Sequence, residues 1–437
     1  MRRFIARGPI VLPFFALALT LGCSDDVDDG VGGNGSNGAN GGQPDAAAAD
    51  AEPDAGADDA GTVDASADGG ATDVGPVAPC PAIGTALPEG TAPPRRGDTS
   101  LAVDPACGRL FLFSGDDGEP QNCGFPPSSF VYDLYVYDTF RERWYELQPE
   151  GDWMAAPPTA PIPRARMTTA WDANRGRLVV FGGRWRAGDS GPYTFPSDVW
   201  AYDPETNAWT QLASEGAGPS GRMGHTMHAD PDRDQMIIAF GAREFASLRY
   251  DVSQTNDVWA FDLENNAWDR LADTNPPGAP APQARLFHYA AVDTLRGRLW
   301  LFSGSSSDPF GFDPGVPSEL ADSWYLDLPT ERWTRYTPGT PPTSRFRGPM
   351  AYDAVRDQLV IYGGHDNTPL GNNSEVWTYD ITANAWTLRN QGDTLNPDPS
   401  FDPNAGDTRC NFPGDFANYV EGTPERREGH MFAIYGD

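Results

Sequence analysis

A fifteen-residue segment with two spaced aromatic residues occurs five times in this chain of 437 residues. One copy reads DVWAYDPETNAWTQL, at residues 198–212. In every copy an aromatic residue stands nine positions before a tryptophan. The five pairs are Tyr135/Trp144, Trp200/Trp209, Trp259/Trp268, Trp324/Trp333 and Trp377/Trp386. Self-similarity of this kind is the signature of a repeat architecture, so the repeat decides what the chain can fold into.

Each repeat opens with an arginine that is followed eight residues later by an aspartate. The pairs are Arg96/Asp104, Arg164/Asp172, Arg222/Asp230, Arg285/Asp293 and Arg345/Asp353. An apolar run ending in glycine comes next, such as RLVVFGG at 177–183. In DVWAYD the aromatic residues alternate with small ones, as in a strand, and DPETN supplies turn residues. Because no long helical period occurs, we predict four short strands in each repeat, A to D.

A four-stranded unit with one aromatic face cannot bury that face alone, whereas units stacked around an axis can. The glycine pair after strand B and the spaced Tyr/Trp pair together resemble the kelch family of β-propellers, over about residues 95–437. Ser-Gly replaces the glycine pair in the first and fourth repeats, and Phe-Gly replaces it in the third. The resemblance implies an all-β propeller with strand A nearest the axis. We expect the aromatic pairs to fill the seams between blades.

The number of blades is five or six. The segment REGHMFAIYGD at 427–437 carries another opening motif, with Arg427 as its arginine. In kelch propellers a C-terminal strand often completes the first blade, but TSLAV at 99–103 already supplies such a strand. The propeller therefore has five blades with an extra closing strand, or six with the last one incomplete.

Residues 1–23 have the layout of an export signal. Three arginines precede a short apolar run, which is too short to span a bilayer. The run ends in Thr20-Leu21-Gly22-Cys23, which resembles a bacterial lipobox. The resemblance implies lipidation of Cys23, and Ser24 after it favours export beyond the inner membrane. An ordinary secreted protein is the alternative.

Residues 24–78 form an acidic linker of Gly, Ala, Asp and Asn, with a net charge of −13. Such a segment has little apolar surface to offset its ordering entropy, so we expect a disordered stalk. Residues 79–437 are then the propeller. The net charge of the whole chain, −31, argues against a nucleic-acid partner. All 31 basic residues are arginine, which excludes chemistry that needs a lysine.

Four cysteines besides Cys23 are an even number with three possible pairings, as an oxidising compartment allows. Cys123 follows strand B of the first repeat, and Cys410 follows strand D of the last one. In a closed propeller these two loops share one face and are neighbours, so we predict a Cys123–Cys410 bond. Cys80 and Cys107 then form the second bond.

The opening arginines begin the innermost strands, so they approach one another around the axis. They are Arg96, Arg164, Arg222, Arg285, Arg345 and Arg427. In kelch propellers this position commonly lines the ligand-binding face, and such arginines could hold a carboxylate, an acidic sugar or an acidic peptide. Alternatively they serve the repeat itself, bonded to loop carbonyls and to acids of neighbouring blades.

The loops between strands B and C differ among the repeats, and specificity belongs where repeats differ. The loop 184–196 contributes Trp185, Arg186 and Tyr193, a set of exposed aromatics and a cation suited to glycan or peptide surfaces. Packing of the loop on its neighbours is the alternative. His365 follows the glycine pair of the fifth repeat and is a candidate for a lone functional histidine.

His225, His288 and His430 each stand three residues after an opening arginine. A three-histidine metal site is conceivable there, but a residue that belongs to the repeat pattern is the favoured interpretation, so we assign no metal and no cofactor. The chain has no G-x-S-x-G, H-E-x-x-H or phosphate-loop motif. Nor can the Tyr, His and Cys set of a galactose oxidase-like enzyme be assigned.

The sequence thus favours a lipid-anchored propeller in a bacterial cell envelope, at the outer membrane or cell surface. It would bind a glycan, peptide or protein, without catalysis. The alternatives are a galactose oxidase-like or sugar-modifying enzyme, and a structural component of the envelope.

Overall fold

A computed structural model gives the structure of the protein. It describes residues 80–94, 96–116, 130–187, 192–245, 252–272, 278–307, 319–366, 373–392, 394–395, 417–418 and 431. The described chain is built of strands, with one short 3₁₀ helix, η1 (Pro231–Arg233). No helix within these ranges is long and apolar enough to cross a membrane.

Five antiparallel sheets of four strands make up the blades, numbered here in chain order. Blade 1 consists of β2 (Ser100–Asp104), β3 (Arg109–Asp116), β4 (Phe130–Asp138) and β5 (Arg143–Leu147). Blade 2 consists of β6 (Thr168–Asp172), β7 (Arg177–Phe181), β8 (Val199–Asp203) and β9 (Ala208–Ala213). Blade 3 consists of β10 (Thr226–Asp230), β11 (Gln235–Ala239), β14 (Val258–Asp262) and β15 (Ala267–Leu271). Blade 4 consists of β16 (Tyr289–Asp293), β17 (Arg298–Phe302), β18 (Ser323–Asp327) and β19 (Arg332–Tyr336). Blade 5 consists of β20 (Met350–Asp353), β21 (Gln358–Tyr362), β22 (Val376–Asp380) and β23 (Ala385–Asn390).

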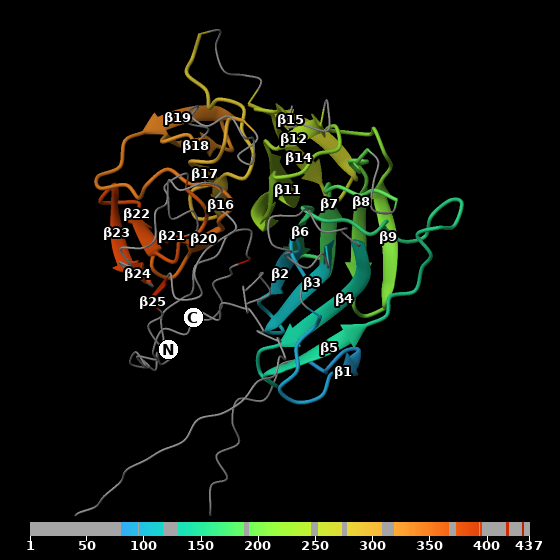
Figure 1. The fold of residues 1–437 in the computed structure, drawn as a ribbon. Helices are drawn as coiled ribbons and strands as arrows, with labels where there is room; N and C mark the ends of the chain where they lie inside the picture. Colours follow the sequence, from blue (N-terminus) through green and yellow to red (C-terminus); the bar gives the residue numbers. More distant parts are fainter. Residues whose placement is uncertain are drawn as a thin grey trace, which may run out of the picture. The chain divides into compact units, whose positions relative to one another are not determined.

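The blades have a propeller arrangement, which confirms the predicted fold class. The first strands of successive blades lie side by side: β2 contacts β6, β6 contacts β10, β10 contacts β16 and β16 contacts β20. In Figure 1 the inner strands β2, β6, β16 and β20 lie towards the middle, and the outer strands β5, β9, β19 and β23 lie at the periphery. Because strand direction alternates, the A–B and C–D turns share one end of the blades, here called the turn face. The B–C and D–A loops share the other end, the loop face.

In the described chain, three pairings of short strands occur in addition to the four main strands of each blade. β1 (Thr85–Ala86) pairs with β5 as a fifth strand of blade 1, and β12 (Ala242–Phe245) pairs with β13 (Val252–Gln254) in a loop of blade 3. β24 (Thr394–Leu395) pairs with β25 (Ala417–Asn418). The innermost strand of blade 1 is its own β2, as TSLAV predicted. Apart from Met431, the further opening motif at 427–437 lies outside the described residues, and the described residues form five blades.

The two residues after strand B explain why the glycine pair is degenerate. The first has a φ of 50–70° and is Ser114, Gly182, Phe240, Ser303 or Gly363. The second has a φ of 92–129° and is always glycine. A Cβ on Gly183 would stand 2.8 Å from the carbonyl oxygen of Ala165, and one on Gly115 would stand 2.8 Å from that of Gly97. The second position therefore requires glycine in every blade, whereas the first accepts serine in blades 1 and 4 and phenylalanine in blade 3. In blade 2 the first position also requires glycine, because a Cβ on Gly182 would stand 2.8 Å from the carbonyl oxygen of Arg222.

Aromatic side chains fill the seams between blades, as predicted. In four seams a phenylalanine that lies in strand B of one blade, or directly after it in the case of Phe240, contacts the tryptophan of strand D in the next blade. The ring-centroid distances are 5.1 Å for Phe113–Trp209, 5.4 Å for Phe181–Trp268, 5.8 Å for Phe240–Trp333 and 5.4 Å for Phe302–Trp386. The second tryptophan of the repeated segment is thus a wedge between sheets.

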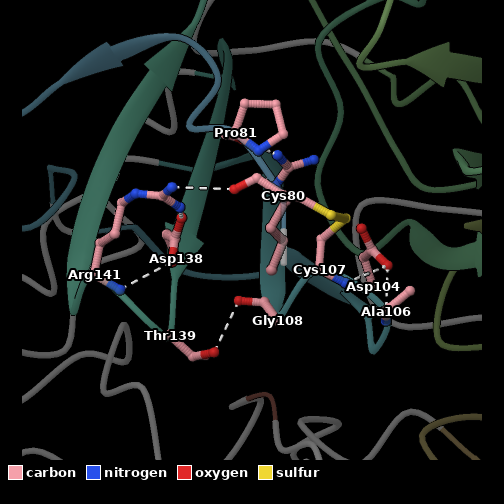
Figure 2. The surroundings of a disulfide bond; sticks show 10 residues. Cys80, Pro81, Asp104, Ala106, Cys107, Gly108, Asp138, Thr139 and Arg141 are labelled. Atoms are coloured by element: carbon pink, nitrogen blue, oxygen red, sulfur yellow. Dashed lines mark hydrogen bonds and ion pairs between the residues drawn. A yellow bond between two sulfur atoms is a disulfide. The ribbon is translucent and has the colours of Figure 1, made fainter. Parts of the chain in front are cut away.

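A disulfide between Cys80 and Cys107 ties the start of the described chain to blade 1, as the sequence predicted. Figure 2 shows Cys80 between the A–B turn and the C–D turn of this blade, where Arg141 donates to its carbonyl oxygen at 3.1 Å. The described chain therefore begins on the turn face. Cys123 and Cys410 lie outside the described residues.

Histidines at the seams are buried and neutral. His225 and His288 lie one blade apart, and the Nε2 of each hydrogen-bonds the Oγ1 of a threonine on the inner strand of the preceding blade, Thr168 and Thr226 respectively. Burial lowers the pKa of His225 to about 3, with the charge of Arg222 adding to the effect. Burial lowers the pKa of His228 to about 4 and that of His288 well below its usual value.

The depressed pKa values of these histidines predict that the folded protein loses stability in mild acid. Their folded-state pKa values are depressed, so below about pH 6.5 the unfolded chain takes up protons that the folded chain does not. The free energy of unfolding should fall as the pH is lowered from 7.5 to 4.5, measured by denaturant titration at each pH. Because His228 contributes to this slope, His228→Gln should flatten it. An unchanged slope in that variant would contradict the assignment.

Candidate functional site

The opening arginines are buried side chains of the blade interior. Arg164, Arg222, Arg285 and Arg345 are 0% exposed and Arg96 is 4% exposed. Each forms an ion pair with an acid of its own blade, which directly precedes strand C in blades 2 to 5 and lies within it in blade 1. The partners are Asp133, Asp198, Asp257, Asp322 and Glu375, in blade order. The structure therefore brings the five arginines into equivalent places, but it directs each guanidinium into its blade.

The ion pair of blade 3 shows the geometry. Nη1 and Nη2 of Arg222 donate to the two oxygens of Asp257 at 2.7 and 3.0 Å, and Nη1 also donates to the carbonyl oxygen of Phe240 at 2.9 Å. Trp259 Nε1 donates to the same carboxylate at 2.8 Å. Burial by itself raises the pKa of Asp257, but the hydrogen bonds and the charge of Arg222 outweigh it, so its pKa lies well below the usual range. Trp259, the first aromatic residue of the repeated segment, thus fixes the carboxylate of Asp257, which in turn binds Arg222.

Such contacts are of the kind expected if the opening arginines serve the repeat itself by bonding to carbonyls and acids. The acid, however, comes from the same blade and not from a neighbouring one. Ligand binding by Arg96, Arg164, Arg222, Arg285 and Arg345 stays a prediction, and Arg427 lies outside the described residues.

A second set of residues reaches the axis two positions after each opening arginine. Its members have a φ of 51–63°, and they are Asp98, Arg166, Gly224, Phe287 and Arg347. The carboxylate of Asp98 accepts from Arg166 Nε at 2.6 Å and from Arg347 Nη2 at 2.7 Å. Arg184, which follows the glycine pair of blade 2, also donates to it at 3.2 Å. We call Arg166, Arg184 and Arg347 around Asp98 the arginine cluster.

The arginine cluster joins blades 1, 2 and 5 on the loop face. Blade 4 contributes the ring of Phe287, which packs against two of the arginines. The guanidinium carbons of Arg166 and Arg347 lie 5.4 and 5.3 Å from the ring centroid of Phe287. The four charged side chains are each 12–14% exposed, so solvent still reaches them. Three guanidiniums thus surround Asp98 in a strongly acidic protein, and a second carboxylate, that of Asp116, lies 3.9 Å from Arg184 Nη2.

The electrostatics of the cluster reflect this imbalance. Burial by itself raises the pKa of Asp98, but the charges of Arg166, Arg347 and Arg184 outweigh it and hold the pKa well below its usual range. Burial and the positive charge of Arg184 lower the pKa of the Arg166 guanidinium to about 10. An additional anion would lower the energy of such a cluster.

The loop 184–196 extends the cluster outwards. The ring of Tyr193 lies between two guanidiniums, 4.7 Å from Arg184 and 4.8 Å from Arg186. Trp185 packs against Trp153 of the preceding D–A loop, with ring centroids 6.4 Å apart. The structure therefore brings three predicted residues, Trp185, Arg186 and Tyr193, to the edge of the arginine cluster. Contacts within the loops also account for part of their packing.

His365 occupies in blade 5 the position that Arg184 has in blade 2. Its backbone pairs with Phe346, and its ring lies 5.0 Å from the ring of that residue. It is therefore on the loop face, and a role in binding stays a prediction. Cys23 lies outside the described residues.

Comparison with known proteins agrees with the architecture. Residues 83–280 and 249–401 match the KLHDC2/KLHL20/DRC7 Kelch-repeats domain, and together they span more than half of the chain. The chain belongs to the kelch-repeat family. The resemblance read from the glycine and Tyr/Trp pairs is thereby confirmed for the propeller.

Relatives of this kelch propeller carry names of different kinds. An N-(sulfonatooxy)prop-2-enimidothioate sulfolyase of Thlaspi arvense is 26% identical over 286 residues, which are 63% of this chain and 72% of that protein. Host cell factor 1 of Homo sapiens is 27% identical over 237 residues, which are 52% of this chain. This match covers only 11% of host cell factor 1, and the same values hold for the protein of Rattus norvegicus.

Sequence reasoning missed Asp98, Arg166, Phe287 and Arg347 as site residues. The signal that could have found them is variation at a fixed place in the repeat. The opening residue is arginine in all five repeats, whereas the residue two positions later is acidic, basic, aromatic or glycine. A residue that serves the repeat stays constant, and a residue free of that task can serve a ligand.

The buried ion pairs predict a large effect on stability. Arg222→Ala leaves Asp257 buried without its counter-charge, so it should lower the free energy of unfolding by about 3–5 kcal/mol. Arg356→Ala is the matched control, because this arginine is 48% exposed on the turn face and should cost less than about 1 kcal/mol. Denaturant titration of both variants measures the difference, and equal costs would contradict a scaffold role for Arg222.

Proposed function

We propose that this kelch propeller is a binding module that holds a peptide or protein partner on its loop face. Acidic groups of the partner would lie at the arginine cluster. The observation that carries the proposal is the gathering of Arg166, Arg184 and Arg347 around Asp98, in a chain of net charge −31. Elsewhere the acidic surface would repel such a partner, so the cluster would also orient it.

The surroundings of the cluster support a peptide-like partner. Phe287 and Tyr193 flank the guanidiniums, and Trp185 continues the aromatic surface towards the rim. Aromatic and arginine side chains are the residues that most often carry binding energy in protein interfaces. The names of the relatives include that of an enzyme, so family membership leaves the class of function open and the cluster decides our choice.

The proposal also covers location. We place the protein in a bacterial cell envelope, anchored by a lipid on Cys23 and separated from the membrane by the linker 24–78. The described chain begins at Cys80 on the turn face, at the opposite end of the blades from the arginine cluster.

The anchor has a direct test. Cys23→Ser removes the thiol that would carry the lipid, and should move the protein from the membrane fraction to the soluble fraction of the producing cells. Ser24→Ala is the matched control and should stay with the membrane. Equal partition of the two variants would exclude the lipid anchor.

The acidic partner is tested with a labelled, N-acetylated hexaglutamate amide as probe and hexalysine as its opposite. Hexaglutamate should bind at the cluster, with an affinity that falls as salt rises. Hexalysine is attracted by the acidic surface as a whole, so its binding should not depend on Arg347. Arg347→Ala should weaken binding of hexaglutamate roughly tenfold, because one guanidinium of the cluster is lost. Fluorescence anisotropy at two salt concentrations measures both effects.

Arg356→Ala is the matched control for that experiment, since it removes the same charge from the opposite face. Thermal unfolding of each variant shows whether the propeller is intact. If Arg347→Ala and Arg356→Ala bind hexaglutamate equally, the arginine cluster is not the binding site.

A further inference from the structure

Asp98 occupies a position where the fold does not require an acid. Backbone hydrogen bonds link residues at this position in neighbouring blades, Asp98 with Arg166, and Gly224 with Phe287 and Arg347. Arg166 N donates to Asp98 O at 2.6 Å, Phe287 N to Gly224 O at 2.7 Å and Arg347 N to Phe287 O at 2.9 Å. These bonds do not involve side chains, and blade 3 carries glycine in the same conformation, with a φ of 63°. The side chain of Asp98 is therefore free to serve the cluster.

The side chain is held as a bound carboxylate would be held. Its Oδ2 accepts from Arg166 and Arg184, and its Oδ1 accepts from Arg347, so both oxygens are engaged by residues of other blades. Arg184 has a second, looser ion pair, because its Nη2 lies 3.9 Å from Asp116 Oδ2. Within the described residues, the buried Nε of Arg184 has no hydrogen-bond partner.

We propose that Asp98 is an internal competitor for the anionic group of the partner. Its carboxylate fills, in the free protein, the place in the arginine cluster that a partner carboxylate enters. The partner class named here, a carboxylate-bearing peptide, rests on the proposed function, whereas the capacity of the cluster for a free carboxylate does not. Asp98 would then lower the affinity of the cluster for a ligand with a single carboxylate. It would favour partners with several acidic groups, which together can displace the Asp98 carboxylate or bind beside it.

The first experiment removes the competitor and supplies a small carboxylate. Asp98→Gly keeps the backbone conformation that Gly224 has, and empties the place between the three guanidiniums. We expect this variant to unfold at a lower temperature than the unaltered protein, and acetate to restore the melting temperature in a saturable way. Sodium chloride at the same ionic strength should not restore it.

Asp357→Gly is the matched control. Asp357 also has a φ near +53° and also pairs with an arginine, Arg296, but on the turn face and with that one guanidinium. For Asp357→Gly, acetate and sodium chloride at the same ionic strength should give the same melting temperature. If Asp98→Gly responds to acetate no more than Asp357→Gly does, the cluster does not take a free carboxylate and the proposal is overturned.

The second experiment measures competition directly. Asp98→Asn keeps the shape of the side chain and removes its charge, and asparagine tolerates this left-handed conformation. It should bind the hexaglutamate probe roughly tenfold more tightly than the unaltered protein, because a like charge is removed from the site. Asp357→Asn should leave the affinity unchanged. Equal or weaker binding by Asp98→Asn would overturn the role of Asp98 as a competitor.

The two experiments separate this proposal from the proposed function. If acetate restores Asp98→Gly but no variant binds hexaglutamate, the carboxylate site stands and the acidic peptide partner is wrong. If the unaltered protein binds hexaglutamate through Arg347 but Asp98→Gly ignores acetate, the binding module stands and the competitor role is wrong.

Discussion

The rest of the structure depends on one buried ion pair in each blade, between the opening arginine and the acid near the start of strand C. Withdrawing two charges from water is costly, and it is offset only when the remaining donors and acceptors are satisfied. In blade 3 a bidentate contact, a tryptophan Nε1 and a strand carbonyl satisfy them. The arginine backbone meanwhile accepts from the second glycine of the preceding blade, as Arg222 O does from Gly183 N at 2.8 Å. One residue thus fixes both a blade and its junction with a neighbour.

Because the opening arginines stabilise the blades, other residues of the loop face are available to bind a partner. Because the opening arginines turn inward to their acids, they contribute little positive charge to the axis. The charge there comes from Arg166, Arg184 and Arg347. The place of Arg166 and Arg347 is taken by Asp98, Gly224 and Phe287 in the other three blades. The blades are therefore alike where they must pack and unlike where a partner can be recognised. Asp98, in contact with blades 2 and 5, makes the cluster one unit.

Much of the fold followed from local sequence rules. Strand positions, the turn at DPETN and the seam tryptophans such as Trp209 could be read from the repeat, because each depends on neighbours close in the chain or on the identical neighbour one repeat away. Ser114 shows where that reading fell short. Its Oγ accepts from Arg164 N of the next blade at 2.9 Å, a bond that makes serine a functional substitute for the first glycine. Ser303 does the same for Arg345 at 2.8 Å.

The sequence by itself determined an all-β repeat with one arginine, one acid and two aromatic residues per unit, since these residues recur at fixed spacing. It also predicted that Cys80 and Cys107 would pair. Only the tertiary structure decided which arginines are scaffold and which face the axis. Arg164 and Arg166 are two residues apart, yet the first is fully buried against Asp198 and the second meets Asp98. The reason is physical: the left-handed backbone at Arg166 directs its side chain to residues that lie far away in the sequence, and no local pattern records them.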